Sequence, residues 1–309
     1  MNSDSHLLAS NGGHISLTRH WGKNTLHRMG LVKQKGTTKA KVLVEDFDVV
    51  KAQFLSDIKA VIEMEEVPPA LVINWDQTGI NYVPVSAWTM AKEGSKRVEI
   101  SGIDDKRQIT GVYGCSMAGD FLPIQLVYQG KTPRCIPSFN FPPDWDITFT
   151  HNHWCNERTV KDYIEKILVP YITRKREELK LKADHRALVI YDVFRGQCTQ
   201  AILELLDTNN IDVVFVLPNC TDRLQPLDVS LNKPAKVFLR DKFQKWYAQQ
   251  VCKQLKEGEK TMIDVRLSIM KPLGAKWLID MYDYFKSKPD IILNGFKGVG
   301  ITDYVNFSF

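Results

Sequence analysis

A run of uncharged, largely apolar residues that ends on an aspartate most constrains the fold of this chain. Ala187 to Tyr191 are rich in branched and aromatic side chains, and Asp192 follows directly. Such a run is typical of a β-strand that is buried on both faces. A carboxylate at the end of a buried strand costs free energy unless it is hydrogen-bonded or binds a cation. The sequence therefore predicts a strand over 187–192 with a functional carboxylate at its end.

The same pattern occurs at two other places. Leu71 to Trp75 run into Asp76, and a buried-strand pattern over 211–217 continues through a turn to Asp228. Three carboxylates at strand exits predict a shared cation site. For each aspartate taken alone, the alternative that it caps a helix or closes a turn stays open.

The length and composition are those of a globular protein with a substantial core. The chain has 309 residues, of which 44% are hydrophobic and 25% charged. This length fits one large domain or two. The six cysteines are scattered without a C-x-x-C pair, which argues against a zinc module or a disulfide scaffold and indicates the cytosol or nucleus. No apolar stretch reaches the roughly 18–20 residues that span a bilayer, so we expect no membrane association.

The basic residues are concentrated near the N-terminus. Residues 1–44 hold seven lysines and arginines but one acidic residue, Asp4, while the whole chain has a formal net charge of +5. Residues 14–29 have imperfect helical spacing of apolar residues and are followed by a basic tract. This combination predicts a DNA-recognition helix with an arm that contacts the phosphate backbone. An ordinary amphipathic helix with a solvated basic face is the alternative. The side chains expected to contact DNA are Arg19, His20, Lys23, Arg28, Lys33 and Lys35.

The order of elements predicts an α/β architecture. After an amphipathic helix over 45–65 come three strands, a long helix that Asn156 should cap, the strand 187–192, a helix over 199–206, the strand 211–217 and a helix over 233–255. We expect a mixed sheet with helices outside, and active residues at strand ends. The glycine-rich tail, NGFKGVGITD, is interpreted as a docking or capping segment. The glycines of 71–130 match no phosphate-binding loop, so no small-molecule cofactor is expected.

The acidic residues favour one kind of metal chemistry. Three carboxylates in one place repel one another, and a divalent cation or protonation relieves the repulsion. Ligand sets made of oxygen favour Mg²⁺ or Mn²⁺ over zinc. Two such ions can assist in-line phosphoryl transfer. A second metal triplet, His151, His153 and Cys155, is disfavoured because alternating residues of this kind usually serve packing and surface.

Three segments resemble the acidic motifs of one transposase family. NWDQTGI (74–80), IYDVFRGQ (190–197) and LPNCTDRLQPLDVSLNKPAK (217–236) are similar to those of the pogo/Tigger branch of DDE-superfamily transposases, which are related to mariner elements. The resemblance implies an RNase H-like fold, two divalent metals and DNA strand cleavage and transfer. By position, it implies that Asp76, Asp192 and Asp228 are the catalytic metal ligands. Asp222 is the rival third acid.

The N-terminal part, TRHWGKNTLHRMGLVKQKGTTK, resembles the end of a centromere protein B-like helix-turn-helix region. The family usually carries two such units, and here the last helix and arm are present, so we expect a truncated DNA-binding region. The predicted organisation is a basic helix-turn-helix remnant over 1–44, a connector helix over 45–69, an RNase H-like DDE endonuclease domain over 70–256 and a helical tail over 257–309.

Two principal functions compete at this stage. The first is a metal-dependent DNA endonuclease or transposase, which the three acids favour. The second is a domesticated, non-catalytic nuclear DNA-binding protein that kept the fold, which the short DNA-binding region favours. A nuclease for another nucleic acid is a third, weaker alternative. DNA is the expected partner, a homo-oligomer is an open alternative, and the family implies a location in the nucleus.

Four residues near the acids either contact phosphate or belong to the surface: Arg195, Gln197, Arg223 and Gln225.

Overall fold

The computed structural model of the chain describes residues 44–84, 105–193, 198–217, 219–258 and 262–305, together with Trp21, Thr25, Arg28 and Met29. The chain divides into two compact units, residues 1–41 and residues 42–309. In the first unit Trp21, Thr25 and Arg28 are helical, and the Thr25 hydroxyl donates to the Trp21 carbonyl at 2.9 Å. Those three positions agree with the helix predicted over 14–29. Five of the predicted DNA contacts lie outside the described residues: Arg19, His20, Lys23, Lys33 and Lys35.

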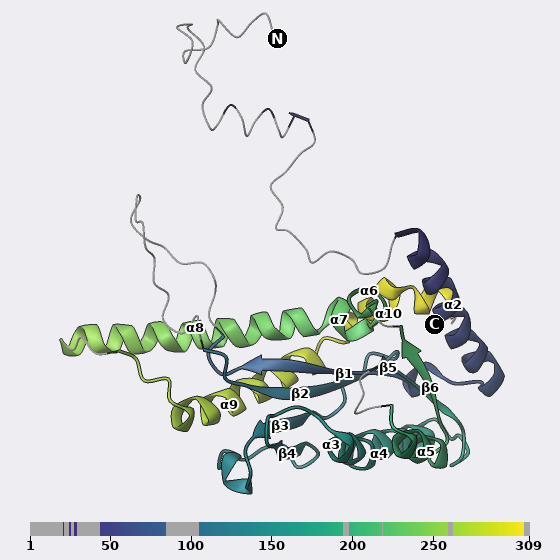
Figure 1. Cartoon of the computed structure of the whole chain (residues 1–309), viewed down its shortest axis with the longest axis horizontal. Coiled ribbons are helices and arrows are strands. Elements are labelled where there is room, and N and C mark those ends of the chain that lie inside the picture. Colours follow the sequence, from purple (N-terminus) through teal and green to yellow (C-terminus); the bar gives the residue numbers. More distant parts are fainter. Residues whose placement is uncertain are drawn as a thin grey trace, which may run out of the picture. The chain divides into compact units, whose positions relative to one another are not determined.

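The second unit is built on a mixed six-stranded sheet (Figure 1). Its strands are β1 Val72–Asn81, β2 Gln108–Ser116, β3 Gln125–Gln129, β4 Asp146–Thr150, β5 Ala187–Asp192 and β6 Ile211–Val216. They lie in the order β4-β3-β2-β1-β5-β6. β1, β2 and β3 form an antiparallel meander, whereas β5 pairs with β1 and β6 with β5 in parallel. An antiparallel meander extended by parallel strands beside its first strand is the RNase H-like arrangement.

Helices cover both faces of this sheet, with α3, α4 and α5 on one side and α7, α8 and α10 on the other (Figure 1). The helices are α2 Val44–Glu65, α3 Glu157–Tyr163, α4 Val169–Glu178, α5 Gln200–Thr208, α6 Thr221–Leu224, α7 Pro226–Ser230, α8 Asn232–Glu257, α9 Leu267–Lys286, α10 Pro289–Val299 and α11 Ile301–Val305. A π-helical turn, Ile164–Leu168, joins α3 to α4, and short 3-10 turns occupy Pro69–Leu71 and Pro133–Cys135. No helix in the described part of the chain is long and apolar enough to cross a membrane.

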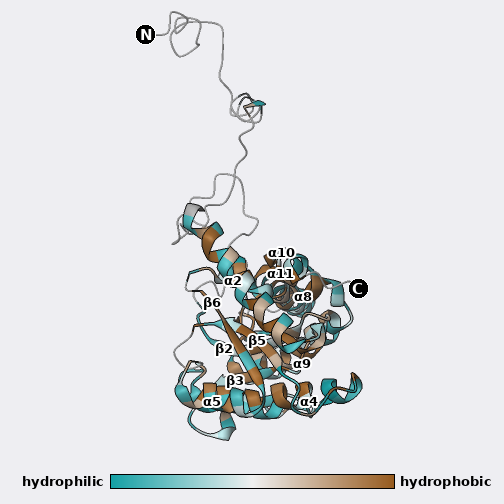
Figure 2. Cartoon of the chain, turned by 90° about the vertical axis from the view of Figure 1, so that its right-hand side faces the viewer, coloured by the Kyte–Doolittle hydropathy of each residue, from teal (hydrophilic) through white to brown (hydrophobic). Residues whose placement is uncertain are grey.

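The core lies between the two helical layers, where the strands carry mainly apolar residues (Figure 2). The fully buried rings of Trp75 on β1 and Tyr191 on β5 stack at 4.6 Å between centroids, and Tyr163 of α3 meets Trp75 edge-on at 5.3 Å. Aromatic pairs of this geometry add to the stabilisation that comes from area burial alone. They fix β1, β5 and α3 against one another directly beside the two aspartates that follow Trp75 and Tyr191.

The predicted cap of the long helix is confirmed. The Asn156 side chain accepts the Thr159 backbone N–H at 3.1 Å, and the Thr159 hydroxyl oxygen accepts the Asn156 backbone N–H at 2.9 Å. This reciprocal capping box satisfies two backbone donors that a helix start leaves without partners.

Two parts of the fold were not predicted from the sequence. β4 was not predicted, because its sequence DITFT places polar side chains, Thr148 among them, where they are buried. The glycine-rich tail, which was interpreted as a docking or capping segment, is helical and forms the end of α10 and most of α11. Gly295 lets α10 approach α7 closely, because a Cβ at this position would lie 2.4 Å from the Ser230 hydroxyl.

Candidate active site

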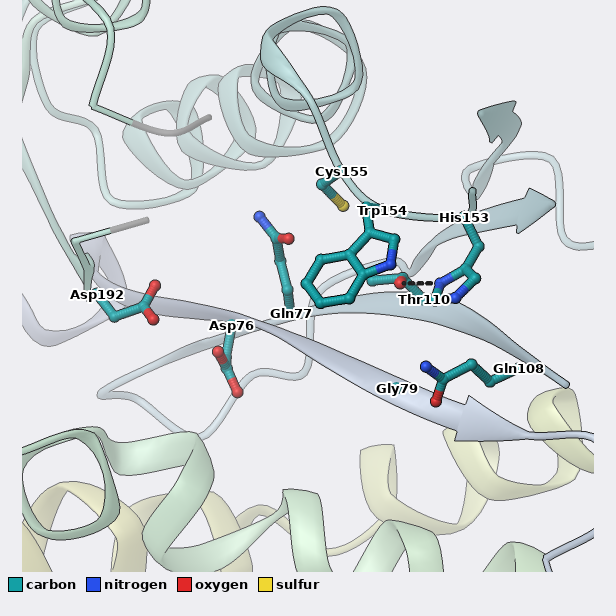
Figure 3. Close-up of a pocket in the computed structure, with 9 residues that line it drawn as sticks. All are labelled: Asp76, Gln77, Gly79, Gln108, Thr110, His153, Trp154, Cys155 and Asp192. Atoms are coloured by element: carbon teal, nitrogen blue, oxygen red, sulfur yellow. Dashed lines mark hydrogen bonds between the residues drawn. The ribbon is translucent and has the colours of Figure 1, made fainter. Parts of the chain in front are cut away.

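Asp76 lies in the middle of β1 and not at its end, which corrects the prediction of a strand exit. β1 continues to Asn81 because its second half pairs with β2, from Asp76 opposite Tyr113 to Asn81 opposite Gln108. Successive side chains of a strand point to opposite faces. The Asp76 carboxylate, 7% exposed, therefore leaves β1 on the opposite side from Gln77 (Figure 3).

Asp192 is the last residue of β5, as predicted. The parallel register of β1 and β5 pairs Asn74 with Ile190. Asp76 and Asp192 both lie two residues beyond this pair, so the register places the two aspartates at the same level of adjacent strands. Asp192 is half-buried.

Asp228 comes from helix α7 and not from a turn, which corrects a second detail of the prediction. α7 is held against β1 by Asn74, which is 0% exposed. The Asn74 side chain accepts the Leu227 backbone N–H at 3.0 Å and donates to the Ile190 carbonyl at 2.7 Å. Asn74 thus fixes β5 and α7 to β1 and positions all three aspartates. The role of Asn74 was not predicted from the sequence. The one indication of it there is that a polar residue interrupts the apolar run of a buried strand.

Asn232, the first residue of α8, connects two of the acids. Its side-chain nitrogen donates to Asp76 Oδ2 at 2.5 Å and to Asp228 Oδ1 at 2.8 Å. The residue is 5% exposed, and its Oδ1 atom is buried without a hydrogen-bond partner. Asn232 was also missed, although it follows Asp228 by only four residues in the sequence.

The three carboxylates influence one another electrostatically. Burial, followed by the negative charges of Asp228 and Asp192, raises the pKa of Asp76 to about 7, against the opposing hydrogen bond from Asn232. Burial and the charge of Asp228 raise the pKa of Asp192. Burial likewise raises the pKa of Asp228, while Asn232 and the cation of Lys236 lower it. The fold therefore brings the three predicted acids into one electrostatic cluster, hereafter the acidic cluster.

The cluster suits a divalent cation by its chemistry. Its donors are carboxylate oxygens in a mutually repulsive set, which is the ligand type that Mg²⁺ and Mn²⁺ prefer. The buried, unpaired Oδ1 of Asn232 is a further oxygen beside them. Within the described residues, however, no three histidine, cysteine or acidic side chains converge tightly enough to form a ready-made metal site. The Asn232 amide group instead lies between Asp76 and Asp228.

The other residues predicted near the acids have mostly structural contacts. Gln225 is buried, and its side chain donates to the Trp75 carbonyl at 3.2 Å. The Arg223 guanidinium lies 4.6 Å from the centroid of the Phe47 ring on α2. Asp222, the rival third acid, is exposed on α6, and its charge raises the pKa of Asp228. Arg195 and Gln197 lie outside the described residues.

A cleft of about 180 Å³ begins at Asp76 and Asp192 and runs along the Gln77 side of β1 (Figure 3). The remaining lining residues are Gly79, Gln108, Thr110, His153, Trp154 and Cys155. His153 and Cys155 belong to the disfavoured metal triplet. The His153 Nδ1 atom lies 3.2 Å from the Thr110 hydroxyl, and Cys155 is buried.

The fold and the acidic cluster define a protein of the RNase H-like class. The sequence model of the DDE superfamily endonuclease family matches residues 106–277, more than half of the chain. The chain belongs to this family. Asp192 and Asp228 lie inside the matched range, and Asp76 precedes it.

Relatives and solved structures of the transposase type are similar to the chain. The "Pogo transposable element with KRAB domain" of Homo sapiens is 24% identical over 90% of this chain and 43% of the human protein. The Mus musculus protein of the same name is 22% identical over the same shares. The chain thus spans less than half the length of these curated relatives.

Solved structures that are similar to the chain include complexes of the Mos1 transposase. The Mos1 transposase paired-end complex with left transposon end has a TM-score of 0.48 and 14% identity, over 88% of this chain and 71% of that one. The Mos1 mariner paired end complex with Mn has a TM-score of 0.47 and 15% identity, over the same shares.

Proposed function

We propose that the chain is a DNA-binding, metal-dependent endonuclease of the transposase type, with Asp76, Asp192 and Asp228 as its catalytic metal ligands. The observation that carries the proposal is the acidic cluster itself. A strand interior, a strand end and a helix, far apart in sequence, bring three carboxylates together although this raises their pKa values. Such an arrangement costs stability, and perturbed groups of this kind cluster at functional sites.

The three carboxylates would hold Mg²⁺ or Mn²⁺. When bound, such an ion neutralises charge on phosphate oxygens and makes water a stronger nucleophile at neutral pH. The Asp76 carboxyl group, with a pKa of about 7, is substantially protonated at neutral pH and must lose its proton to serve as a ligand. Before a cation binds, Asn232 holds the side chains of Asp76 and Asp228 in place, because its amide donates a hydrogen bond to each of them.

Basic side chains beside the acidic cluster would contact the DNA backbone. Lys233, Lys236 and Arg240 follow Asn232 at helical spacing on α8, and Lys233 and Lys236 are exposed. Lys236 is near enough to Asp228 to lower its pKa. Such cations attract the DNA backbone toward acids that would otherwise repel it.

We extend the DNA-binding role to the basic residues of 1–44. We also propose that the protein is located in the nucleus and that it self-associates on DNA.

The second candidate is a non-catalytic nuclear DNA-binding protein that retains this fold. One observation favours it: the Asn232 amide lies between two of the acids, where its N–H groups neutralise part of their repulsion without a cation. In that case the acidic cluster would serve the structure, and its affinity for divalent ions would be weak.

Titration calorimetry with Mn²⁺ distinguishes the two candidates. The wild type is compared with Asp192→Asn, which keeps the side-chain shape but removes one charge. Asp283→Asn is the matched control, because Asp283 is exposed on α9. The proposed function requires Mn²⁺ binding that Asp192→Asn weakens and Asp283→Asn leaves unchanged. Equal binding by all three proteins, or none, would favour the non-catalytic candidate.

A further inference from the structure

Trp154 is an exposed aromatic residue in the wall of the cleft that starts at the acidic cluster. It is 55% exposed, although its neighbour Cys155 is buried. Its indole and the Gln77 side chain lie on the same side of β1, and Asp192 lies at one end of the cleft (Figure 3). An indole that folding leaves in water retains a large apolar surface that a ligand can cover.

The loop that carries Trp154 is fixed by several hydrogen bonds. The Thr150 hydroxyl donates to the Trp154 carbonyl at 3.0 Å, and the Trp154 backbone N–H donates to the Asn152 side chain at 3.3 Å. His153 has a φ of 59°, in the left-handed region that few non-glycine residues occupy, and its ring contacts Thr110 of β2. The backbone that carries the indole is therefore fixed before any ligand binds, which lowers the entropy lost on binding.

His153 does not make this wall a phosphate site. Burial lowers the pKa of His153, which disfavours a positive charge on its imidazole. Its ring lies 6.0 Å from the Trp154 indole with 27° between the planes. The wall thus presents two aromatic rings inclined by 27°, which favour a flat ligand over an anionic one.

Two amide side chains add polar groups to the cleft. Gln77 and Gln108 line the same cleft as Trp154. Gly79 leaves room for one of them, because a Cβ at this position would lie 2.8 Å from Gln108 Oε1. An exposed aromatic ring and amide groups in one cleft are the combination that binds a nucleobase, by stacking on its face and hydrogen bonding to its edge.

We propose that Trp154 stacks on an unpaired nucleobase of the DNA strand whose phosphate is held at the acidic cluster. The inference rests on the proposed function, because that function brings a DNA strand to Asp76 and Asp192. Bases in an intact duplex stack on one another, so the ligand of the cleft is an unpaired nucleotide at a nick, an overhang or a distorted site. Stacking tolerates any base, since every base has a π-face.

The test uses the whole chain with Ca²⁺ in place of Mg²⁺ or Mn²⁺, so that the acidic cluster has a cation with oxygen ligands while binding is measured. The probe is a short single-stranded oligonucleotide that carries 2-aminopurine, whose fluorescence falls when it stacks, and a fully paired duplex is the comparison. Wild type is compared with Trp154→Ala and Trp154→Phe. Tyr304→Ala is the control, because Tyr304 is an exposed aromatic residue on α11.

We expect Trp154→Ala to bind the single strand about 10- to 100-fold more weakly and to lose the quenching of 2-aminopurine. Trp154→Phe should keep most of both, and duplex binding should change little in any variant. The inference is wrong if Trp154→Ala and wild type bind and quench the single strand equally, or if duplex and single-strand binding fall together. A parallel assay of cation-dependent nicking tests the proposed function separately, because quenching without nicking contradicts that function and leaves stacking intact.

Discussion

Replacing Asp76 with asparagine is predicted to stabilise the protein at pH 8 and to remove much of the pH dependence of its stability. The pKa of Asp76 is about 7 in the folded chain, against an ordinary value of 3.8. Between these two values the folded state binds more protons than the unfolded state, so the free energy of unfolding falls as the pH rises through this window. It levels off above pH 7, where Asp76 is ionised in both states.

The size of the effect follows from the same pKa difference. Each unit corresponds to about 1.4 kcal/mol, so ionised Asp76 destabilises the folded chain by on the order of 4 kcal/mol. This is a large fraction of the roughly 5–15 kcal/mol that stabilises a typical domain. Asparagine carries no charge and retains an oxygen that accepts the hydrogen bond from Asn232, so the variant should lack this penalty.

The assay is urea unfolding of the wild type and Asp76→Asn between pH 4 and pH 8, followed by tryptophan fluorescence. The two proteins should have similar stability near pH 4, and the variant should become progressively more stable than the wild type toward pH 8. Other titrating groups are common to both proteins, so the difference between the curves reports Asp76 together with its charge interactions with Asp192 and Asp228. A difference that does not change with pH, or a variant that is less stable at pH 8, would refute the account of a buried, repulsive acidic cluster.

Two further substitutions test neighbouring parts of the structure. Asn232→Leu removes the amide that donates to Asp76 and Asp228, and each hydrogen bond to a charged group contributes roughly 1.5–3 kcal/mol. We therefore expect a further rise in the pKa of Asp76, seen as a fall in stability that continues above pH 7; an unchanged pH profile would contradict the bridge. Asn156→Ala removes the cap of α3 and should cost about 1 kcal/mol in urea unfolding at every pH, whereas Mn²⁺ binding should not change. A changed Mn²⁺ affinity in this variant would mean that α3 takes part in the site.

The sequence predicts the buried strands well, because a continuous apolar run has few alternatives to the centre of a sheet. β5 and β6 were placed within one residue of their observed ends. β1 was predicted to end at Asp76, since QTGIN after it has no apolar run. That half of β1 is held by its ladder with β2, a long-range partner that local composition does not reveal.

The sequence predicts the three acids of the candidate site but not the residues that position them. Carboxylates at or near the ends of apolar runs are visible as a pattern, and Asp76, Asp192 and Asp228 do form one cluster. Their mutual placement depends on the register of β1 with β5 and on the two amide side chains of Asn74 and Asn232. Asparagine is common in loops and at helix starts, so neither amide stands out until the fold brings it to the acids.

Nicking of supercoiled plasmid in Mg²⁺ or Mn²⁺ tests the central claim most directly. The wild type, Asp192→Asn and the control Asp283→Asn are compared at pH 8, where Asp76 is ionised, after their folding and DNA binding have been verified. The account predicts nicking by the wild type and the control that requires the cation, and none by Asp192→Asn. If all three proteins nick equally, or if the folded wild type binds DNA and does not nick, the acidic cluster is not a working catalytic site.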